Sequence, residues 1–574
     1  MLDYRSPWKP LLAGALNKML AEAALDAPLD SSHIVVEAPP RPELGDLAFP
    51  MFSYAKLFRK GPPWIAQALC GRLSAVPELA AQGSFSVEGP YLNLRLNRGD
   101  LAARVLAAVF EGAGGEDFPF GRPGVLAGSR IMVEFSSPNT NKPLHLGHLR
   151  NNALGESISR ILRACGAELY KVCIINDRGI HICKSMLSYR EHGGGKSPES
   201  EGIKSDHFVG DWYVRFSRDL KDETEALAGE GGLDKKEAEA RAPLMLRAQE
   251  LLRQWEAGDG ETVELWRKMN SWAVEGMKQT WNRTGITFDK FYYESQTYLL
   301  GKDEILKGLD RGIFYREADG SVQVDLSAEK LDKKVLLRKD GTSIYITQDI
   351  GTAIFRHGDW PFDRLVYVVG SEQQYHFKVL FSVLNKLGFD WAKNLYHLSY
   401  GMVNLPEGKM KSREGTVVDA DDLIDRLRDM ALAEIRAKER EEAVGDPEAV
   451  AEKVALGALH YYLLQVSPSK DMLFDPKESL SFNGNTGPYL QYMGARISAL
   501  LHKASLREGD SVPWEAALLG GDAEWDLIKT LAAYPASVAQ AAEGMDPSVI
   551  TAYLYELSKN FSRFYHDCPV LNAE

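Results

Sequence analysis

The stretch that decides the fold runs from Arg130 to Asp177 and reads RIMVEFSSPNTNKPLHLGHLRNNALGESISRILRACGAELYKVCIIND. Residues 130–135 are mostly apolar, as expected of a buried strand, and residues 168–177 predict a second one. Between them apolar side chains recur at helical spacing, and Gly166 is a natural helix stop. Those side chains are Leu154, Ile158, Ile161, Leu162 and Cys165. Strand, helix and strand at this spacing form a βαβ unit, so we predict a parallel sheet.

The segment before this unit predicts a separate α+β domain at residues 1–115. SHIVVEAPP (32–40) and SFSVEGPYLNLRLN (84–97) predict strands, and WIAQALCGRL (64–73) predicts a helix between them. The glycines and prolines of EGAGGEDFPFGRPG (111–124) are typical of a linker.

The segment after it predicts the rest of the sheet domain, which we place at residues 125–420. Residues from about 190 to 285 are polar and helical, and they interrupt this domain as an insertion. The sheet then resumes at GITFDKFYYES (285–295) and continues through TSIYITQDIG, RLVYVVGSEQQYHF and LYHLSYGMV. Residues 421–574 predict an all-α domain of ordinary size. The predicted fold class is therefore α/β and multidomain, with a Rossmann-like parallel-sheet domain between an α+β domain and a helical bundle.

Composition excludes several classes of protein. The chain has 574 residues, 45% hydrophobic and 26% charged, which is typical of a globular protein of several domains. Its N-terminus lacks a signal-peptide layout and no long apolar run is present, so we expect a cytoplasmic protein without a membrane partner. The five cysteines contain no C-x-x-C pair and indicate neither a disulfide framework nor a metal site. A net charge of −13 argues against a general DNA-binding protein but not against a local nucleic-acid surface.

The first candidate site is the loop between the strand at 130–135 and the helix that follows. His145 and His148 flank Gly147, and Lys142 lies just upstream. An isolated loop histidine is usually just hydrogen-bonded. Here the group follows a buried strand, at the place where helix N-termini of parallel-sheet proteins bind phosphate. Imidazoles and a lysine suit phosphate oxygens, and Gly147 leaves room for a base or ribose. We therefore favour a nucleotide site.

The second candidate site is GKMKSREG (408–415), a short segment with two lysines and an arginine after the strand LSYGMV. Alone it would be interpreted as an exposed basic turn. Together with the histidine motif it suits a loop that closes on a triphosphate and neutralises charge at the α-phosphate.

These two motifs resemble the signature motifs of class I aminoacyl-tRNA synthetases. EFSSPNTNKPLHLGHLRNNALGESISRIL, GMVNLPEGKMKSREGTVV and SFNGNTGPYLQYMGARI are similar to blocks of one family among them, the arginyl-tRNA synthetases. PPRPELGDLAFPMFSYAKLF resembles that family's additional N-terminal domain, which contacts tRNA. The resemblance covers nearly the whole chain. It implies ATP-dependent activation of L-arginine, with Mg²⁺ arriving on ATP, and transfer to the 3′ end of tRNA(Arg) by a monomer.

The resemblance also implies residue roles. Catalytic contacts are expected from Lys142, His145, His148 and Lys409. ATP contacts are expected from His145, Gly147, His148, Gly401, Met402, Val403, Lys409, Met410 and Lys411. The arginine pocket is expected to contain Asn139, Glu294, Tyr345, Asp349 and Gln373. Two carboxylates suit a guanidinium, which pairs with them in a planar, bidentate way. Tyr489 and Tyr492 are expected to stack on bases in the helical domain. No metal ligand is expected.

The sequence departs from the family pattern at three places. Lys411 stands where the second motif usually has serine, and the motif lacks the usual lysine at its fourth position. In such enzymes a lysine before the first motif is thought to compensate, and Lys142 matches it. Arg178 and His181 replace the common tryptophan and glutamine, and no role is assigned to them. The chain ends at CPVLNAE, where relatives commonly continue, so we expect part of the anticodon surface to lie outside it.

Two other functions compete with this interpretation. A glutamyl-tRNA synthetase would need a cationic pocket, which Glu294 and Asp349 argue against. A tRNA-binding paralogue without activity should have lost the histidines or the lysine motif, and both are present.

Overall fold

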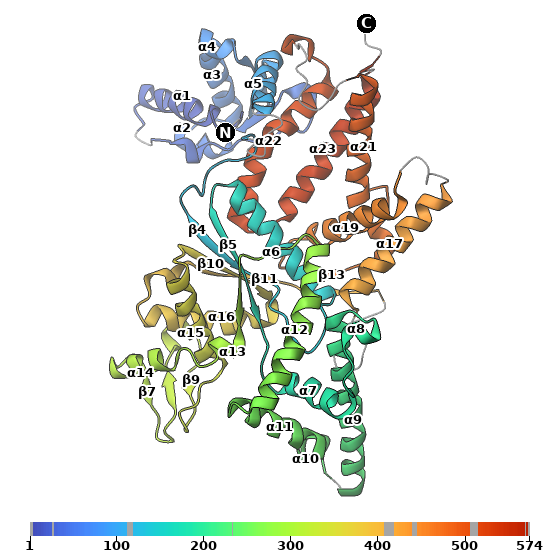
Figure 1. Cartoon of the computed structure of the whole chain (residues 1–574). Coiled ribbons are helices and arrows are strands. Elements are labelled where there is room, and N and C mark those ends of the chain that lie inside the picture. The colour runs from blue at the N-terminus through green and yellow to red at the C-terminus, as the bar shows by residue number, and fades with distance from the viewer. Residues whose placement is uncertain are drawn as a thin grey trace. The chain divides into compact units, whose positions relative to one another are not determined.

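The computed structural model describes residues 4–25, 28–111, 119–231, 233–406, 418–438, 445–505, 515–568 and 570–571. It divides into two compact units (Figure 1). One consists of Met1–Pro123, Met493–Gln540 and Ala552–Glu574, and the other of Gly124–Tyr492 and Ala541–Thr551. None of the described helices is both long enough and apolar enough to span a membrane.

The larger unit is built on the predicted parallel sheet. Its five strands lie in the order β11-β10-β4-β5-β6, and every neighbouring pair is parallel. Their bounds are β4 Arg130–Glu134, β5 Glu168–Ile175, β6 Lys290–Tyr293, β10 Arg364–Gly370 and β11 Leu395–Tyr400. The chain winds outward from β4 in one direction and from β10 in the other. This reversal opens a crevice beyond the carboxyl ends of β4 and β10, where ligands bind in such sheets.

Helices cover both faces of this sheet (Figure 1). Helix α6 (Leu146–Ala164) joins β4 to β5, and all five side chains predicted for its apolar face are buried. Gly166 follows with φ +95°, which confirms the predicted helix stop. Helices α14 (Lys302–Asp310), α15 (Tyr345–Asp359) and α16 (Gln374–Lys386) pack in a separate core that includes Met132, Leu365 and Tyr367.

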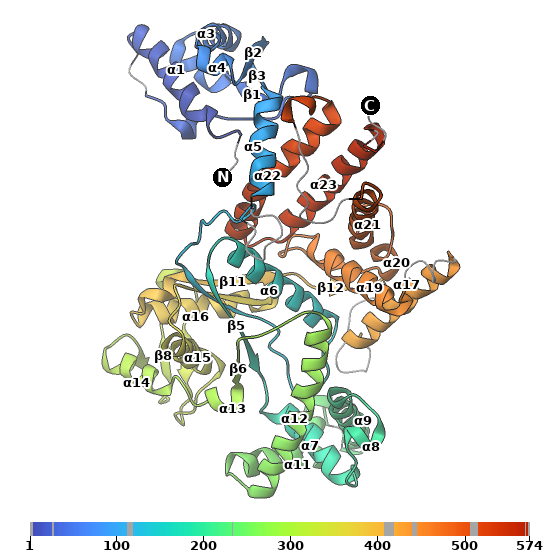
Figure 2. The same ribbon diagram turned by 45° about the horizontal axis from the view of Figure 1, so that its top comes forward.

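The predicted insertion is helical. It contains α7 Ile180–His192, α8 Pro198–Glu201, α9 Ser205–Gly231, α10 Lys235–Arg241, α11 Pro243–Glu256 and α12 Gly260–Arg283. Figures 1 and 2 show α7, α9, α11 and α12 as one cluster of helices. A small antiparallel sheet follows, with strands β7 Tyr315–Arg316, β8 Val322–Val324 and β9 Lys334–Leu337. Strands β12 (Val403–Asn404) and β13 (Met472–Leu473) form a parallel pair.

Two segments differ from the prediction. The sequence predicts a strand at TSIYITQDIG, but its residues from Tyr345 onward begin helix α15. Ile346, Ile350 and Ala353 are buried at helical spacing, and this longer pattern outweighs the local β-branched residues. SHIVVEAPP does not form a strand either. Ser31–His33 is a 3-10 turn, and Glu37 makes an isolated bridge to Ala48.

The smaller unit contains the N-terminal segment and part of the C-terminal helices. Its antiparallel sheet has the order β1-β3-β2, with β1 Leu47–Pro50, β2 Gly83–Glu88 and β3 Tyr91–Leu96. Three helices pack around this sheet: α1 (Trp8–Glu22), α3 (Pro62–Ser74) and α5 (Arg98–Phe110). Trp525, Ile528 and Ala532 of α22 (Asp522–Gly544) belong to the same hydrophobic core. Trp525 also donates a hydrogen bond to Asp46 over 2.6 Å.

The remaining helices lie in the C-terminal part, where an all-α domain is predicted, and the short strand β13 is an exception within it. They are α17 Ala420–Ala437, α19 Pro447–Leu464, α20 Pro476–Ser479, α21 Gly487–Lys503 and α23 Ser548–Asp567. Helices α17 and α19 pack side by side within the larger unit.

A buried ion pair ties β4 to α15 directly below the crevice. Glu134 is the last residue of β4, and its carboxylate accepts a hydrogen bond from the guanidinium of Arg356. The two side chains are 8% and 2% exposed. Burying charges is costly unless they are paired, so each depends on the other.

We therefore predict that Glu134→Ala strongly destabilises the larger unit. The loss should be about 3–5 kcal/mol, because it leaves the Arg356 charge buried without its partner. The matched control is Glu304→Ala, which removes a surface partner of Lys307 and should cost less than about 1 kcal/mol. Thermal unfolding followed by tryptophan fluorescence measures both. Equal melting temperatures for the two variants would contradict the prediction.

Candidate active site

The segment that leaves β4 turns sharply at two serines. Ser136 and Ser137 have φ of 73° and 46°, a left-handed conformation that non-glycine residues rarely adopt. Asn151 of α6 accepts a hydrogen bond from the Ser136 N–H, and Asn176 donates one to the Ser137 carbonyl over 3.0 Å. Such strain persists only where the surroundings enforce it, often at functional sites. The turn aims Asn139 at the crevice.

The predicted histidine motif caps the N-terminus of α6. Nδ1 of His145 accepts a hydrogen bond from the Gly147 N–H over 3.1 Å. Nδ1 of His148 accepts one from the His145 N–H over 3.2 Å. In a neutral imidazole, a ring nitrogen that accepts leaves the proton on the other nitrogen. Both rings therefore have Nε2–H as their free donor.

The charge state of this motif follows from burial. Burial, together with the nearby Lys142 charge, lowers the pKa of His145 to about 4. Burial likewise holds the pKa of His148 well below its usual value. Burial also lowers the pKa of Lys142, and among the described residues its ammonium has no hydrogen-bond or ion-pair partner. The motif thus combines two neutral donors with one desolvated cation.

Gly147 has an additional structural role. A side chain there would place Cβ about 3.0 Å from the His145 ring, closer than ordinary packing allows. Glycine therefore permits the capping geometry as well as the predicted approach of a ligand.

The segment 401–403, which is predicted to contact ATP, lies beside the same helix. Arg150 of α6 is fully buried, and its guanidinium donates to the carbonyls of Gly401 (2.8 Å) and Met402 (3.1 Å). It also donates to the carbonyls of Pro468 and Lys470. The Val403 side chain is buried, so its backbone is the part that a ligand can meet. Lys409, Met410 and Lys411 lie outside the described residues.

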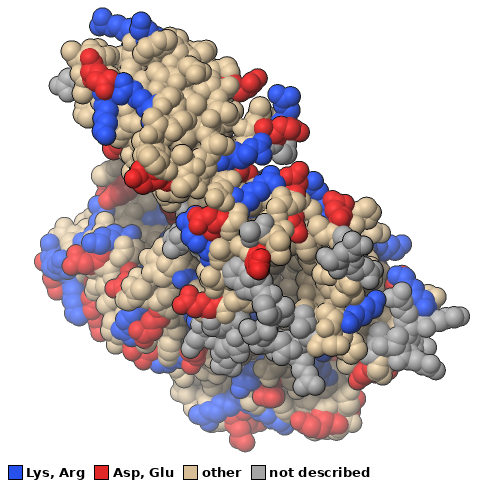
Figure 3. All heavy atoms as spheres, turned by 90° about the horizontal axis from the view of Figure 1, so that it is seen from above, with Lys and Arg blue, Asp and Glu red and all other residues tan. Residues whose placement is uncertain are grey.

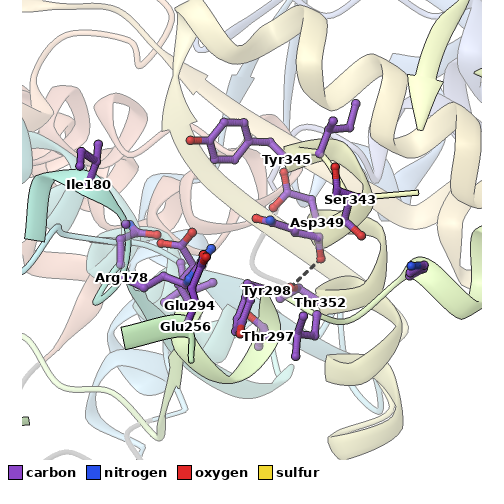
Figure 4. Close-up of a pocket in the computed structure, with 18 of the residues that line it drawn as sticks. Arg178, Ile180, Glu256, Glu294, Thr297, Tyr298, Ser343, Tyr345, Asp349 and Thr352 are labelled. Atoms are coloured by element: carbon purple, nitrogen blue, oxygen red, sulfur yellow. Dashed lines mark hydrogen bonds and ion pairs between the residues drawn. The ribbon is translucent and has the colours of Figure 1, made fainter. Parts of the chain in front are cut away.

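The large cavity of the structure lies at the carboxyl edge of the sheet. Its volume is about 1080 Å³, and four of the five residues predicted for the arginine pocket line it: Asn139, Glu294, Tyr345 and Asp349. Gln373, which follows β10, lines an adjoining cavity of about 200 Å³ that shares Asp349 with the first. Figure 4 shows Glu294 on one wall of the large cavity, with Tyr345 and Asp349 facing it from α15.

Glu294 is positioned by its neighbour in the chain. Asp177 at the end of β5 accepts hydrogen bonds from the Ser295 N–H (2.8 Å) and hydroxyl (2.7 Å). This fixes the start of the short helix α13 (Glu294–Thr297) next to β5. Burial raises the pKa of Glu294 to about 7, against the opposing effect of Arg178. A desolvated carboxyl of this kind gains much from a cationic ligand.

Tyr345 and Asp349 are presented by a helix. They lie one turn apart at the start of α15, so both face the cavity. The prediction that TSIYITQDIG continues the sheet is therefore wrong for these two residues. One oxygen of Asp349 lies 2.6 Å from Nε2 of His376. This contact orients the carboxylate and leaves its other oxygen for a ligand.

Sequence reasoning assigned no role to two charged residues of this cavity. Arg178 donates to Glu256 over 2.9 Å, and its guanidinium stacks on the Tyr298 ring at 3.9 Å. Arg178 pairs with Glu256 and not with Glu294 or Asp349, so those two carboxyl groups stay available to a cationic ligand. The position of Arg178 just after β5 could have identified it as a cavity residue. No sequence feature marks Glu256 in this way, because it lies in α11, 78 residues further along the chain.

The predicted base-stacking tyrosines lie on helix α21. Tyr492 is 46% exposed, whereas Tyr489 is half-buried. The structure therefore leaves Tyr492 as the better placed of the two for stacking on a base.

Known proteins match the chain along its whole length. Residues 125–475 match a family described as tRNA synthetases class I (R), catalytic domain. Residues 490–574 match the DALR anticodon binding domain, and residues 8–96 match the arginyl tRNA synthetase N terminal domain. The arginine–tRNA ligase of Treponema denticola is 58% identical, over 100% of this chain and 94% of its own. That of Bacteroides thetaiotaomicron is 48% identical, over 92% and 88%.

Solved structures agree with these matches. The arginyl-tRNA synthetase of Thermus thermophilus superposes with a TM-score of 0.77 at 26% identity, over 100% of this chain and 94% of that one. The Plasmodium falciparum enzyme superposes with a TM-score of 0.72 at 18% identity, over 99% and 92%, and supports the fold alone. The predicted multidomain α/β class is thus confirmed, and the chain belongs to the arginyl-tRNA synthetase family, within the class I aminoacyl-tRNA synthetases.

Proposed function

We propose that this chain activates L-arginine with ATP in the cavity at the carboxyl edge of its sheet. The arginine carboxylate attacks the ATP α-phosphate, which gives arginyl-adenylate and pyrophosphate. The arginyl group then passes to the 3′ end of tRNA(Arg). The observation that carries the proposal is the cavity lined by Asn139, Glu294, Tyr345 and Asp349, of which Asn139 belongs to the segment that leads from β4 to α6. Aminoacylation of total tRNA with each of the twenty amino acids tests it, and charging with any amino acid other than arginine would refute it.

Recognition of the guanidinium is proposed to come from opposed carboxylates. Glu294 and Asp349 approach from different walls, so a cation between them can pair with both. Hydrogen bonds to a charged group contribute about 1.5–3 kcal/mol each. Asn139 lies in the segment between β4 and α6, and Gln373 follows β10; these two would hold the substrate amine and carboxylate, which must point toward ATP.

Catalysis is proposed to rest on positioning and charge. The Nε2–H donors of His145 and His148 and the ammonium of Lys142 would contact the phosphates, with Lys409 approaching from the second motif. Because the imidazoles are neutral, Lys142 supplies the fixed positive charge of the first motif. Preorganised donors of this kind stabilise charge that develops in the transition state.

Mg²⁺ is proposed to arrive on the ATP phosphates, which supply oxygen ligands for this cation. The described residues offer one other group with suitable spacing, Asp206, His207 and Asp421. The Lys204 ammonium already lies 2.8 Å from Asp206 and 2.9 Å from Asp421, so that group is satisfied by the protein itself.

Binding of tRNA is proposed to use the helical domain after residue 420 and the N-terminal domain of residues 1–115. On the face drawn in Figure 3, Lys and Arg side chains of the described residues are interspersed with Asp and Glu. Contacts to tRNA would therefore depend on local clusters and aromatic stacking more than on one extended basic field. We further propose a cytoplasmic monomer, for which sedimentation with and without tRNA is the test.

The first prediction for this site concerns pH. Binding of the cationic guanidinium requires ionised Glu294, whose pKa in the free protein is raised by burial to about 7. Binding must then release a proton, so the arginine KM should rise as pH falls below about 7, by up to about ten-fold per unit. Glu294→Gln should raise the arginine KM roughly 10- to 100-fold at pH 8 and abolish this pH dependence.

The control for this assay is a variant that changes a carboxylate outside the pocket. Glu304→Gln alters a surface carboxylate and should keep the wild-type profile. ATP KM should be nearly constant in both variants. An unchanged arginine KM in Glu294→Gln would remove this residue from the pocket.

The second prediction concerns Lys142. If its charge meets the α-phosphate, Lys142→Ala should reduce kcat and kcat/KM together, by about 10²-fold or more. Single-turnover adenylate formation with tRNA present measures this, and Lys411→Ala is the comparison. A wild-type rate in Lys142→Ala beside a slow Lys411→Ala would assign the catalytic lysine to the second motif.

The third prediction concerns Tyr492. Loss of base stacking costs about 1–3 kcal/mol, so Tyr492→Ala should raise the tRNA KM by roughly 5- to 100-fold. Tyr492→Phe keeps the ring and should behave like wild type. Equal tRNA KM values for both variants and wild type would show that Tyr492 serves helix packing.

A further inference from the structure

Helix α9 of the insertion touches the catalytic loop through a glycine. Gly210 is buried and faces the loop before α6, where the Pro143 ring and the Lys142 backbone lie. A Cβ at position 210 would lie 2.8 Å from Cδ of Pro143 and 3.7 Å from Cα of Lys142. The first distance is shorter than real Cβ contacts allow, and the atom concerned belongs to a rigid ring. Position 210 therefore has no room for a side chain.

The helix itself gives no reason for a glycine at this place. Helix α9 has 27 residues, and glycine is among the least favourable residues in a helix interior. A glycine in such a position usually reflects close packing. Gly229 of the same helix offers an internal comparison, because a Cβ at that position would meet no atom within 4 Å.

Helix α9 is held firmly at this end. Lys204 donates to both oxygens of Asp206, to Thr280 of α12 and to Asp421 of α17. A Cβ at Gly276 of α12 would lie 2.5 Å from the Asp206 nitrogen, so the two helices are in close contact. Displacing α9 would break these buried contacts.

The loop on the other side is held less firmly. Among the described residues, Lys142 and Pro143 make no backbone hydrogen bond, and the Lys142 ammonium has no partner. The next residues are fixed, because Ala420 donates to the Leu144 carbonyl over 3.0 Å and Leu146 donates to the Val418 carbonyl over 3.1 Å. A side chain at position 210 would therefore displace Lys142 and Pro143 before it displaced α9.

We propose that Gly210 is a positioning residue for adenylate formation, through which the insertion sets the place of Lys142. It does not touch substrate. Because Gly210 has no side chain, α9 packs directly against Pro143. This contact fixes the position of the Lys142 backbone. Opening the contact to ordinary distance needs a shift of roughly half an ångström or more. Displacements of this order matter, because about 1 Å of misplacement can slow a reaction about 100-fold.

The inference rests on the proposed role of Lys142, so the experiment includes both residues. Gly210→Ala, Gly229→Ala and Lys142→Ala are compared in single-turnover adenylate formation with tRNA present. Gly210→Ala should slow the reaction about ten-fold or more, with the arginine KM within about two-fold of wild type. Gly229→Ala should react at the wild-type rate. Gly229→Ala should melt at or above the wild-type temperature, since alanine favours the helix. Gly210→Ala should remain folded, with a somewhat lower melting temperature because of the close contact with Pro143.

A rescue variant separates the contact from a folding defect. Pro143→Ala removes the ring atom that Gly210 faces, so Gly210→Ala combined with Pro143→Ala should recover rate relative to Gly210→Ala alone. A wild-type rate in Gly210→Ala while Lys142→Ala is slow would refute the positioning role and leave that of Lys142 intact. A wild-type rate in Lys142→Ala would remove the proposed role of Lys142 and this inference with it. Failure of the double variant to recover would also overturn the inference.

Discussion

Two backbone hydrogen bonds join the segments that carry the proposed catalytic site. Leu146 donates to Val418 and Ala420 donates to Leu144, so the segment that contains the first motif pairs with the residues that follow the second. The first segment comes directly from β4, and the second begins α17. The buried Arg150 adds a further link between α6 and the backbone of Gly401 and Met402. The first motif is thus joined to the described residues on both sides of the second, although 251 residues separate Arg150 from Gly401.

The site reconciles an acidic protein with anionic and cationic substrates by local desolvation. Near α6 the neutral histidines offer donors without adding charge, and Lys142 is a cation that lacks a partner among the described residues. In the cavity, burial raises the pKa of Glu294, and Arg178 is neutralised by Glu256. Each end of the proposed site therefore presents a charge opposite to that of its proposed substrate. The overall charge of −13 contributes little to this, because salt screens the interaction with exposed charges that lie more than about 10 Å away.

The parts of the fold and of the proposed site that depend on local sequence patterns were predictable. The βαβ unit at 130–177, the helix stop at Gly166 and the placement of Glu294 after a strand follow from short-range periodicity. Tyr345 was misplaced because Ile344 and Ile346 favour a strand locally, and only the longer spacing to Ile350 and Ala353 indicates a helix. Pairings across the chain were beyond prediction. Arg178 with Glu256 and Gly210 against Pro143 depend on how the insertion packs, which no single stretch encodes.

The insertion therefore does more than interrupt the sheet. It supplies Glu256, without which Arg178 would place an uncompensated cation beside Glu294 and oppose binding of a second cation. It also supplies the α9 surface against which Pro143 rests. Both contributions act through residues outside the proposed substrate contacts, and both constrain groups that are proposed to make such contacts. Since catalysis by positioning depends on fractions of an ångström, the packing of these helices belongs to the active site as much as the signature motifs do.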